Sequence, residues 1–370
     1  MPSTLIITND FPPRIGGIES FVNEVCTLLD HDVVVYASGS AGAAASDHDR
    51  PFPVIRDGPL LLPTPHVAAR AVGLLAESGA TRVIFGAAAP LGLLARRLRR
   101  AGARHILGLT HGHEIWWAQV PGARGLLRRI GDSCDHLTTI SAYSERRIAN
   151  ALSGSARQRL VRLAPPVDMQ RFRPPSRAEV RGTRRCIAVA RLIPQKGVET
   201  LLRAWRIVLD KNSRNGARRE LIIVGDGPLR RRLERRIRDF ELSDCARLLG
   251  ALPPAAVISQ LQQSDVFALP VRTRLAGLNP EGLGLAALEA AACELPVIVG
   301  DSGGAPETVC DGETGFVVPS GDHALLAERL MLLLDNPALA QEMGVRGRQH
   351  VAAHFSTDVA RARLREVLDL

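Results

Sequence analysis

Short apolar runs alternate with helix-like segments along this chain, and the alternation starts again in the second half. In the first half, strands are predicted at residues 4–8, 33–36, 83–85, 105–109 and 136–140, with a helix at 18–29. In the second half, strands are predicted at 186–190, 220–224, 247–249, 266–269 and 296–300, with helices at 198–209, 228–240, 282–292 and 358–368. This alternation is typical of doubly wound α/β domains.

Two proline pairs, Pro165-Pro166 and Pro174-Pro175, lie where the alternation begins again. They bracket an expected interdomain linker. A chain of 370 residues is long enough for two domains with separate cores. We therefore predict domains at 1–166 and 167–356, and a last segment, 357–370, whose helix packs back on the first domain. Ligands of such sheets bind outside the carboxyl ends of the strands, which predicts a cleft between the two domains. The turn-rich tract 38–49 is expected to be a surface loop.

The net charge of +9 comes almost entirely from arginine, since Lys196 and Lys211 are the only lysines. Leucine and arginine interleave at 94–100 and 126–130. Such segments lie either on an anionic membrane surface or on a solvated helix face. A nucleic-acid partner is not expected, because few aromatics accompany the arginines and no nucleic-acid-binding motif is visible.

The six scattered cysteines form no Cys-x-x-Cys and indicate free thiols in a reducing cytosol. No apolar run reaches a membrane-spanning length, and the first residues resemble a strand, not a secretory signal.

The stretch 280–289 combines two carboxylates with glycines at a predicted helix start. Glycines at such a start let a ligand reach bare N–H groups, where the helix dipole favours an anion. If a helix runs through both, Glu281 and Glu289 lie about 12 Å apart along its axis, beyond the roughly 5–10 Å of a glycosidase pair. We expect the two to contact different parts of one long ligand, such as a nucleotide-sugar.

Two other loops follow predicted strands and open helices. Gly16 and Gly17 permit close backbone approach of a phosphate or sugar, or form only a tight turn. Arg191 and Lys196 provide two cations suited to a diphosphate leaving group, although a plain basic loop has the same composition. The Gly225–Pro228 loop places Asp226 as an expected cap of the next helix.

The segment 110–117 holds two histidines, an acid and two tryptophans after a predicted strand. It predicts a sugar or acceptor subsite, with capping and core packing as the alternative. Its spacing is not that of a zinc protease, and no third ligand is evident. The chain also lacks the Gly-x-Gly-x-x-Gly of nicotinamide and flavin sites and the Walker lysine motif.

Five motifs, in this order along the chain, resemble those of the retaining GT-B glycosyltransferases. They are the Gly16-Gly17 loop, the Arg191/Lys196 pair, the Gly225–Pro228 loop, Glu281…Glu289 and the segment 302–307. The resemblance covers the whole chain. A more specific resemblance is to the actinobacterial phosphatidylinositol mannosyltransferases, especially those adding the second mannose. The segments that carry it are 85–91, 110–114, 128–132, 272–274 and 302–309. It implies two Rossmann-like domains facing a cleft, the first binding the acceptor and the second a nucleotide-sugar.

The resemblance also implies roles for individual residues. Arg191 and Lys196 would hold the diphosphate, helped by backbone N–H groups at Leu283 and Gly284. Glu289 would bind the ribose hydroxyls, and Glu281 the hydroxyls of the donor sugar.

In the first domain, the resemblance puts His111 at the reacting face of the sugar, and Gly16 and Gly17 beside the diphosphate and the acceptor. Asn9, Asp10, His113 and Trp116 would contact the acceptor. Leu252 would hold the base by its backbone, although Pro253-Pro254 follow it where a related enzyme carries an acid that reads guanine, which leaves UDP as an alternative.

The expected reaction moves mannose from GDP-mannose to a phosphatidylinositol mannoside, with retention. No cofactor or metal is required in that mechanism, and Mg²⁺ is allowed without a motif that demands it. The expected location is the cytoplasm, peripheral on the inner face of the plasma membrane, with an anionic lipid acceptor. Another nucleotide-sugar with a soluble acceptor is the alternative, followed by a non-catalytic sugar-nucleotide-binding protein.

Overall fold

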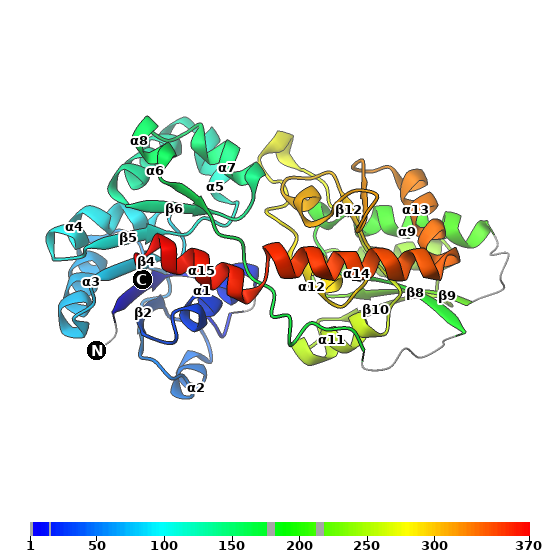
Figure 1. Cartoon of the computed structure of the whole chain (residues 1–370), viewed down its shortest axis with the longest axis horizontal. Helices are drawn as coiled ribbons and strands as arrows, with labels where there is room; N and C mark the ends of the chain where they lie inside the picture. The colour runs from blue at the N-terminus through cyan, green and yellow to red at the C-terminus, as the bar shows by residue number, and fades with distance from the viewer. Residues whose placement is uncertain (1–2, 15, 176–181, 212–217) are drawn as a thin grey trace. The chain divides into compact units, whose positions relative to one another are not determined.

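The computed structural model describes residues 3–14, 16–175, 182–211 and 218–370. The chain divides into two compact units: Met1–Pro166 with Thr357–Leu370, and Val167–Ser356 (Figure 1). Both are doubly wound α/β units, which confirms the predicted fold class.

The first unit is built on a seven-stranded parallel sheet of order β3-β2-β1-β4-β5-β6-β7. All five residues of β1 are buried, as expected for a central parallel strand covered on both faces. The strands are β1 (Thr4–Thr8), β2 (Val33–Ser38), β3 (Val54–Asp57), β4 (Arg82–Phe85), β5 (His105–Gly108), β6 (His136–Thr139) and β7 (Leu160–Arg162).

Helices cover both faces of this sheet. They are α1 (Gly17–Leu28), α2 (Ala43–His48), α3 (Pro65–Ser78), α4 (Ala95–Arg100), α5 (Glu114–Gln119), α6 (Pro121–Ser133), α7 (Ala142–Ala149), α8 (Gly154–Gln158) and α15 (Thr357–Val367). Residues of α3, α4 and α6 share one core cluster with β1, β2, β4, β5 and β6. The last helix, α15, contacts α1, and Arg361 Nη1 donates to Leu28 O at 3.2 Å.

The second unit has a six-stranded parallel sheet of order β10-β9-β8-β11-β12-β13. Its strands are β8 (Thr183–Val189), β9 (Arg218–Val224), β10 (Ala246–Gly250), β11 (Val266–Leu269), β12 (Val297–Gly300) and β13 (Gly315–Val318). Its helices are α9 (Val198–Asp210), α10 (Arg230–Asp239), α11 (Pro254–Gln262), α12 (Leu285–Ala292), α13 (His323–Asp335) and α14 (Pro337–His354).

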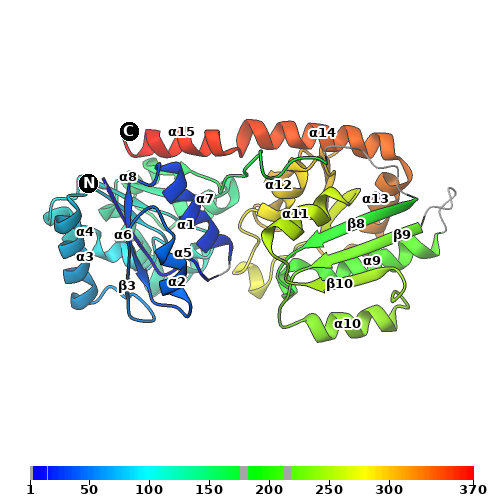
Figure 2. The ribbon, with the colours of Figure 1, turned by 90° about the horizontal axis from the view of Figure 1, so that it is seen from below.

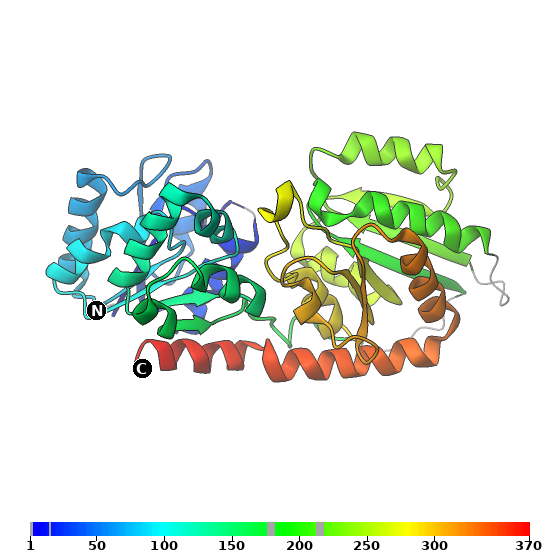
Figure 3. The same cartoon turned by 90° about the horizontal axis from the view of Figure 1, so that it is seen from above.

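The helices of the second unit form two layers. Figure 2 shows α9 and α10 on one face of the sheet and α11 and α12 on the other. Figure 3 shows α13, in brown-orange, on the same side as the green α9, and the two helices pack against each other. The sheet is therefore buried on both faces, and ligands can approach it only at its edges.

Three local predictions were wrong. The tract 38–49 contains a short helix, α2, and is not only a loop. The helix predicted from Gly282 begins at Leu285, because Gly284 adopts a left-handed φ of 103°. Glu281 therefore lies outside the helix, and the axial separation from Glu289 does not apply. Asp226 does not cap α10, whose N-cap is Leu229; its carboxylate accepts from Gly227 N instead.

Within the described ranges, no helix has both the length and the apolar character needed to span a membrane. All six cysteines are free thiols.

Candidate active site

In the second unit, the winding direction of the sheet reverses between β8 and β11. The chain continues from β8 to β9 on one side, and from β11 to β12 on the other. Loops after such neighbouring strands diverge and leave a crevice outside their carboxyl ends. The predicted donor residues Arg191 and Lys196 lie in the loop after β8, which places them at this point.

The loop 190–197 is held by backbone contacts. Arg272, after β11, donates from its backbone N to Gln195 O and from its Nε to Pro194 O, both at 2.8 Å. Gly197 has a φ of 65°, and a Cβ there would lie 1.8 Å from Pro270 O. Only glycine fits that position, so the loop conformation is determined before any ligand binds.

The two loop cations have different surroundings. Lys196 Nζ lies 2.8 Å from Glu281 Oε2 and 2.9 Å from Oε1. Arg191 is exposed, and none of the described residues pairs with its guanidinium. Arg191 is therefore available to an anion, whereas Lys196 already has a carboxylate partner.

Glu281 is fixed by the loop after β12. Its backbone N donates to Ser302 Oγ at 3.2 Å, and its carbonyl accepts from Gly304 N at 2.9 Å. Ser302 Oγ also lies 2.8 Å from Thr273 Oγ1. Gly303, with a φ of 62°, packs so closely that a Cβ would lie 1.9 Å from Glu281 O. These contacts fix the backbone of Glu281, whose carboxylate pairs with Lys196.

The start of α12 lacks a side-chain cap. Gly284 is its N-cap, and no side chain caps the helix, so the first N–H groups lack a capping partner. Leu283 is buried and Gly284 half-buried. An added Cβ at Gly284 would meet nothing closer than 3.6 Å, so φ, not crowding, requires the glycine.

Glu289 lies one turn along α12 and is half-buried. Burial raises the pKa of its carboxyl to about 7, and the nearby Arg171 opposes that shift only in part. No described residue donates a hydrogen bond to this carboxylate, which leaves it available to hydroxyl groups of a ligand.

In the first unit, the winding reverses between β1 and β4. The loop after β1 carries the predicted residues Asn9, Asp10, Gly16 and Gly17, whereas His111 and His113 follow β5. Gly16 is the N-cap of α1 and has extended backbone, with φ 178°. A Cβ on Gly16 would lie 2.2 Å from Glu19 Oε2, whereas a Cβ on Gly17 would meet nothing within 4 Å. The Glu19 side chain therefore covers Gly16 and leaves space beside Gly17.

His111 follows β5 and is held from several sides. Its Nε2 is hydrogen-bonded to Gly86 O, and the edge of Phe21 contacts the ring, with centroids 5.8 Å apart. A carbonyl only accepts, so Nε2 carries the proton and Nδ1 is unprotonated in the neutral ring. Burial lowers the pKa of His111, although Glu114 and the contact with Gly86 partly oppose this.

Glu114, which the sequence did not single out as a site residue, supports this histidine. It is fully buried, and its Oε2 accepts from His111 N at 2.9 Å. His113 Nε2 lies 3.3 Å from its Oε1. A glutamate three residues after His111 is at the spacing from which a carboxylate can reach back to a backbone N–H, and this spacing could have identified it.

The remaining predicted acceptor residues differ in availability. The side-chain amide of Asn9 is already hydrogen-bonded to Leu61, in the loop after β3. Its Nδ2 donates to Leu61 O at 2.9 Å, and its Oδ1 accepts from Leu61 N at 2.7 Å. Asp10 is half-buried, and Trp116 is 45% exposed. Leu252, in the second unit, is half-buried in the loop after β10.

Family models match both units: "Glycosyltransferase Family 4" at residues 15–171 and "Glycosyl transferases group 1" at residues 170–350. The GDP-mannose-dependent alpha-(1-6)-phosphatidylinositol monomannoside mannosyltransferase of Mycolicibacterium smegmatis is 41% identical, over 98% of this chain and 97% of that one. The chain belongs to the GT-B glycosyltransferases. A monoacylated phosphatidylinositol monomannoside mannosyltransferase of Corynebacterium glutamicum is 40% identical, over 99% of this chain and 97% of that one.

Solved glycosyltransferases share the fold at lower identity. Sucrose-phosphate synthase from Thermosynechococcus elongatus superposes with a TM-score of 0.79 at 20% identity, covering 99% of this chain and 98% of that chain. Anabaena HepE in complex with UDP gives a TM-score of 0.80 at 16% identity, covering 99% of each chain. These similarities confirm the GT-B fold, and the family confirms that the chain is a glycosyltransferase.

Proposed function

We propose that this glycosyltransferase moves mannose from GDP-mannose to phosphatidylinositol monomannoside, with retention of configuration. The observation that carries the proposal is the match along the whole chain, at 41% identity, to a mannosyltransferase whose name specifies that donor and acceptor. The second unit supplies groups of the right chemistry: two cations, uncapped helix N–H groups and two carboxylates.

In the proposed donor complex, Arg191 and Lys196 bind the diphosphate together with the N-terminal amides of α12. Glu289 accepts from the ribose hydroxyls, and Glu281 from hydroxyls of the mannose. The cations offset the charge that grows on the leaving phosphate as the sugar bond breaks. The backbone of the loop that carries both residues is held by Arg272, so only their side chains need to adjust to the ligand.

The transfer step needs no protein nucleophile in this proposal. The acceptor hydroxyl attacks the anomeric carbon on the face from which GDP leaves, and a departing β-phosphate oxygen takes the hydroxyl proton. The bond to the acceptor oxygen forms as the bond to the phosphate oxygen breaks, so the configuration is retained. His111, kept neutral by burial, contacts the sugar at its reacting face without adding a positive charge.

A lipid acceptor requires contact with a membrane, and we propose peripheral binding to the inner face of the plasma membrane. Arg96, Arg97 and Arg100 of α4 and Arg124, Arg128 and Arg129 of α6 are exposed. Each would contribute about 1 kcal/mol near an anionic surface, screened within roughly 8 Å at physiological salt. Sedimentation with phosphatidylinositol vesicles at low salt, reversed by added salt, is the expected result; a wild-type protein that ignores such vesicles would favour a soluble acceptor.

The donor assignment is tested with a panel of nucleotide-sugars. GDP release from GDP-mannose in the presence of acceptor should exceed release from UDP-glucose or GDP-glucose by at least tenfold in kcat/KM. Preferential UDP release would replace the proposed donor with the UDP-sugar alternative. No release from any donor would favour a binding protein without catalytic activity.

A further inference from the structure

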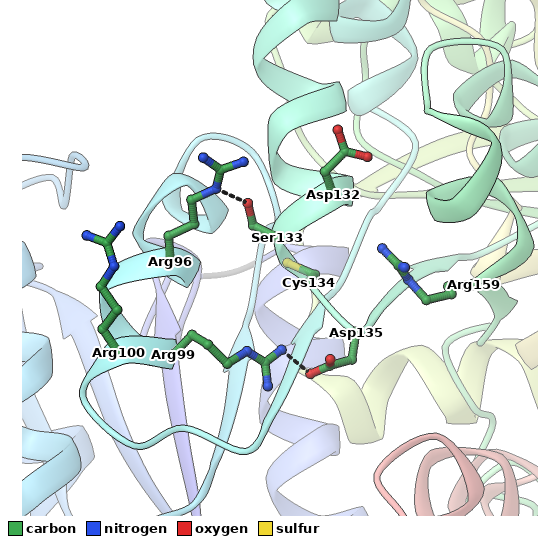
Figure 4. A pocket seen from close by; sticks show the side chains of 8 residues that line it. All are labelled: Arg96, Arg99, Arg100, Asp132, Ser133, Cys134, Asp135 and Arg159. Atoms are coloured by element: carbon green, nitrogen blue, oxygen red, sulfur yellow. Dashed lines mark hydrogen bonds and ion pairs between the residues drawn. The ribbon is translucent and has the colours of Figure 1, made fainter.

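A basic hollow lies at the edge of the first unit's sheet that is opposite His111. Its lining comes from α4, the junction of α6 with β6, and the residue before β7 (Figure 4). These segments meet at the amino ends of β5, β6 and β7, whereas the predicted catalytic loops follow the carboxyl ends. The hollow is therefore separate from the proposed transfer site.

Four guanidinium groups and two carboxylates line the hollow, an excess of two positive charges. Its volume is about 560 Å³, and its lining residues are Arg96, Arg99, Arg100, Asp132, Ser133, Cys134, Asp135 and Arg159. An excess of arginine over acid in a concave site favours an anion, and planar guanidinium groups suit phosphate in particular.

The two carboxylates are already engaged. Asp135 Oδ2 lies 2.5 Å from Arg99 Nη2 and also accepts from Ile106 N at 2.7 Å. Asp132 Oδ1 accepts from Ser153 Oγ. Arg99 is thus a structural residue, and it donates further to the carbonyls of Ala103 and Arg104. The uncompensated charge belongs to the other three arginines.

Those three arginines keep unused donors. Arg96 donates from its Nε to Ser133 Oγ at 3.2 Å, and no described residue pairs with Arg100. Arg159 donates from Nη2 to Gly131 O at 3.1 Å, but its Nε is out of contact with water and has no hydrogen-bond partner among the described residues. Figure 4 shows the guanidinium groups of Arg96 and Arg159 reaching toward the hollow from opposite sides. No described residue accepts from the Nη1 groups of Arg96, Arg100 and Arg159, so these donors remain for an anion in the hollow.

We propose that this hollow is a binding site for a phosphate ester, held by Arg96, Arg100 and Arg159. The ester is either a soluble phosphomonoester or the phosphate of a lipid headgroup, since both present the same oxygens. The proposal does not depend on the donor or acceptor of the transfer reaction.

Amide resonances of Ser133, Cys134 and Asp135, and the Nε–H resonance of Arg159, report on the hollow alone, so phosphate binding at the donor site does not interfere. The protein is titrated with sn-glycerol 3-phosphate, with phosphatidylcholine vesicles containing phosphatidic acid, and with sodium chloride at matched ionic strength. Saturable shifts with the phosphate ester, absent with chloride, are expected. Response to the soluble ester identifies a soluble ligand, and response only to the vesicles identifies a headgroup.

Arg100→Gln should weaken this binding about tenfold, the loss expected for one charge-assisted contact. Arg97→Gln is the matched control in the titration with sn-glycerol 3-phosphate, because Arg97 is an exposed arginine of the same helix that does not line the hollow. The vesicle titration is not used for this comparison, since Arg97 is itself proposed to face the membrane. Equal weakening in both variants would show diffuse surface charge and overturn the proposal. An absence of shifts with both the soluble ester and the vesicles would also overturn it.

Discussion

Lys196 Nζ lies 2.8 Å from Glu281 Oε2, although the proposed roles assign the lysine to the diphosphate and the glutamate to the sugar. The side chains are 22% and 14% exposed, so the pair is only partly screened by water. A diphosphate that takes Lys196 must therefore compete with Glu281, and the lost ion pair reduces the affinity for the nucleotide.

Glu281→Gln should strengthen GDP binding while it weakens sugar transfer. A partly exposed ion pair contributes about 1 kcal/mol, so GDP should bind about fivefold tighter once the competing charge is removed. Transfer should fall by at least tenfold, because the mannose loses a charged contact. Calorimetry with GDP and steady-state kinetics measure the two effects. Unchanged or weaker GDP binding in the folded variant would contradict the competition.

Lys196→Met should lower both the affinity for GDP and the rate of transfer. Its effect on GDP binding is therefore opposite in sign to that of Glu281→Gln. Loss of one preorganised charge at a leaving group reduces turnover by roughly a hundredfold. Lys211→Met is the control, because Lys211 is the only other lysine and lies exposed after α9. Near-normal turnover in Lys196→Met, with the fold verified by circular dichroism, would refute the diphosphate role.

Gly303→Ala should displace Glu281 as well as strain the backbone. Its Cβ would lie 1.9 Å from Glu281 O, whereas a Cβ at Gly312, which also has a left-handed φ, would meet nothing within 4 Å. Gly312→Ala should therefore cost about 1 kcal/mol of unfolding free energy and leave transfer intact.

Chemical unfolding and transfer kinetics on the two variants separate strain from displacement. Gly303→Ala should show greater destabilisation and lose most transfer. Equal effects of the two substitutions on transfer would mean that Gly303 does not position Glu281.

The alternation of apolar runs and helices predicted five strands of each sheet and missed β3, β7 and β13. The central parallel strands, such as β1 and β11, were found because they are continuous apolar runs. The edge strand β3, with sequence VIRD, is half-buried throughout and lacks that signal. The start of α12 was misplaced because glycine can adopt either a helical or a left-handed φ, and the sequence does not show which one Gly284 takes. The Lys196–Glu281 pair joins residues 85 positions apart, so only the converging loops reveal it.

Glu289 should make stability depend on pH. Its pKa is raised from 4.5 to about 7, so the folded state favours the protonated carboxyl. The stability from this group is fully present below about pH 4.5 and is lost as pH rises through 7. Glu289→Gln should therefore stabilise the protein at pH 8, by at most about 3 kcal/mol, and have little effect at pH 4.5.

Urea unfolding of the wild type and Glu289→Gln at both pH values measures this difference. GDP binding provides a second readout, since Gln retains one acceptor for the ribose but loses the charge. A stability gain of the same size at pH 4.5 and pH 8 would show that the carboxyl does not titrate as described.

The proposed mannose transfer can be measured by incubating the protein with GDP-mannose and phosphatidylinositol monomannoside in vesicles and analysing the lipid product. We expect a phosphatidylinositol dimannoside whose new linkage, by NMR of the anomeric proton and carbon, has the α configuration of the donor. A product with the β configuration, or transfer to soluble acceptors without any transfer to the lipid, would contradict it.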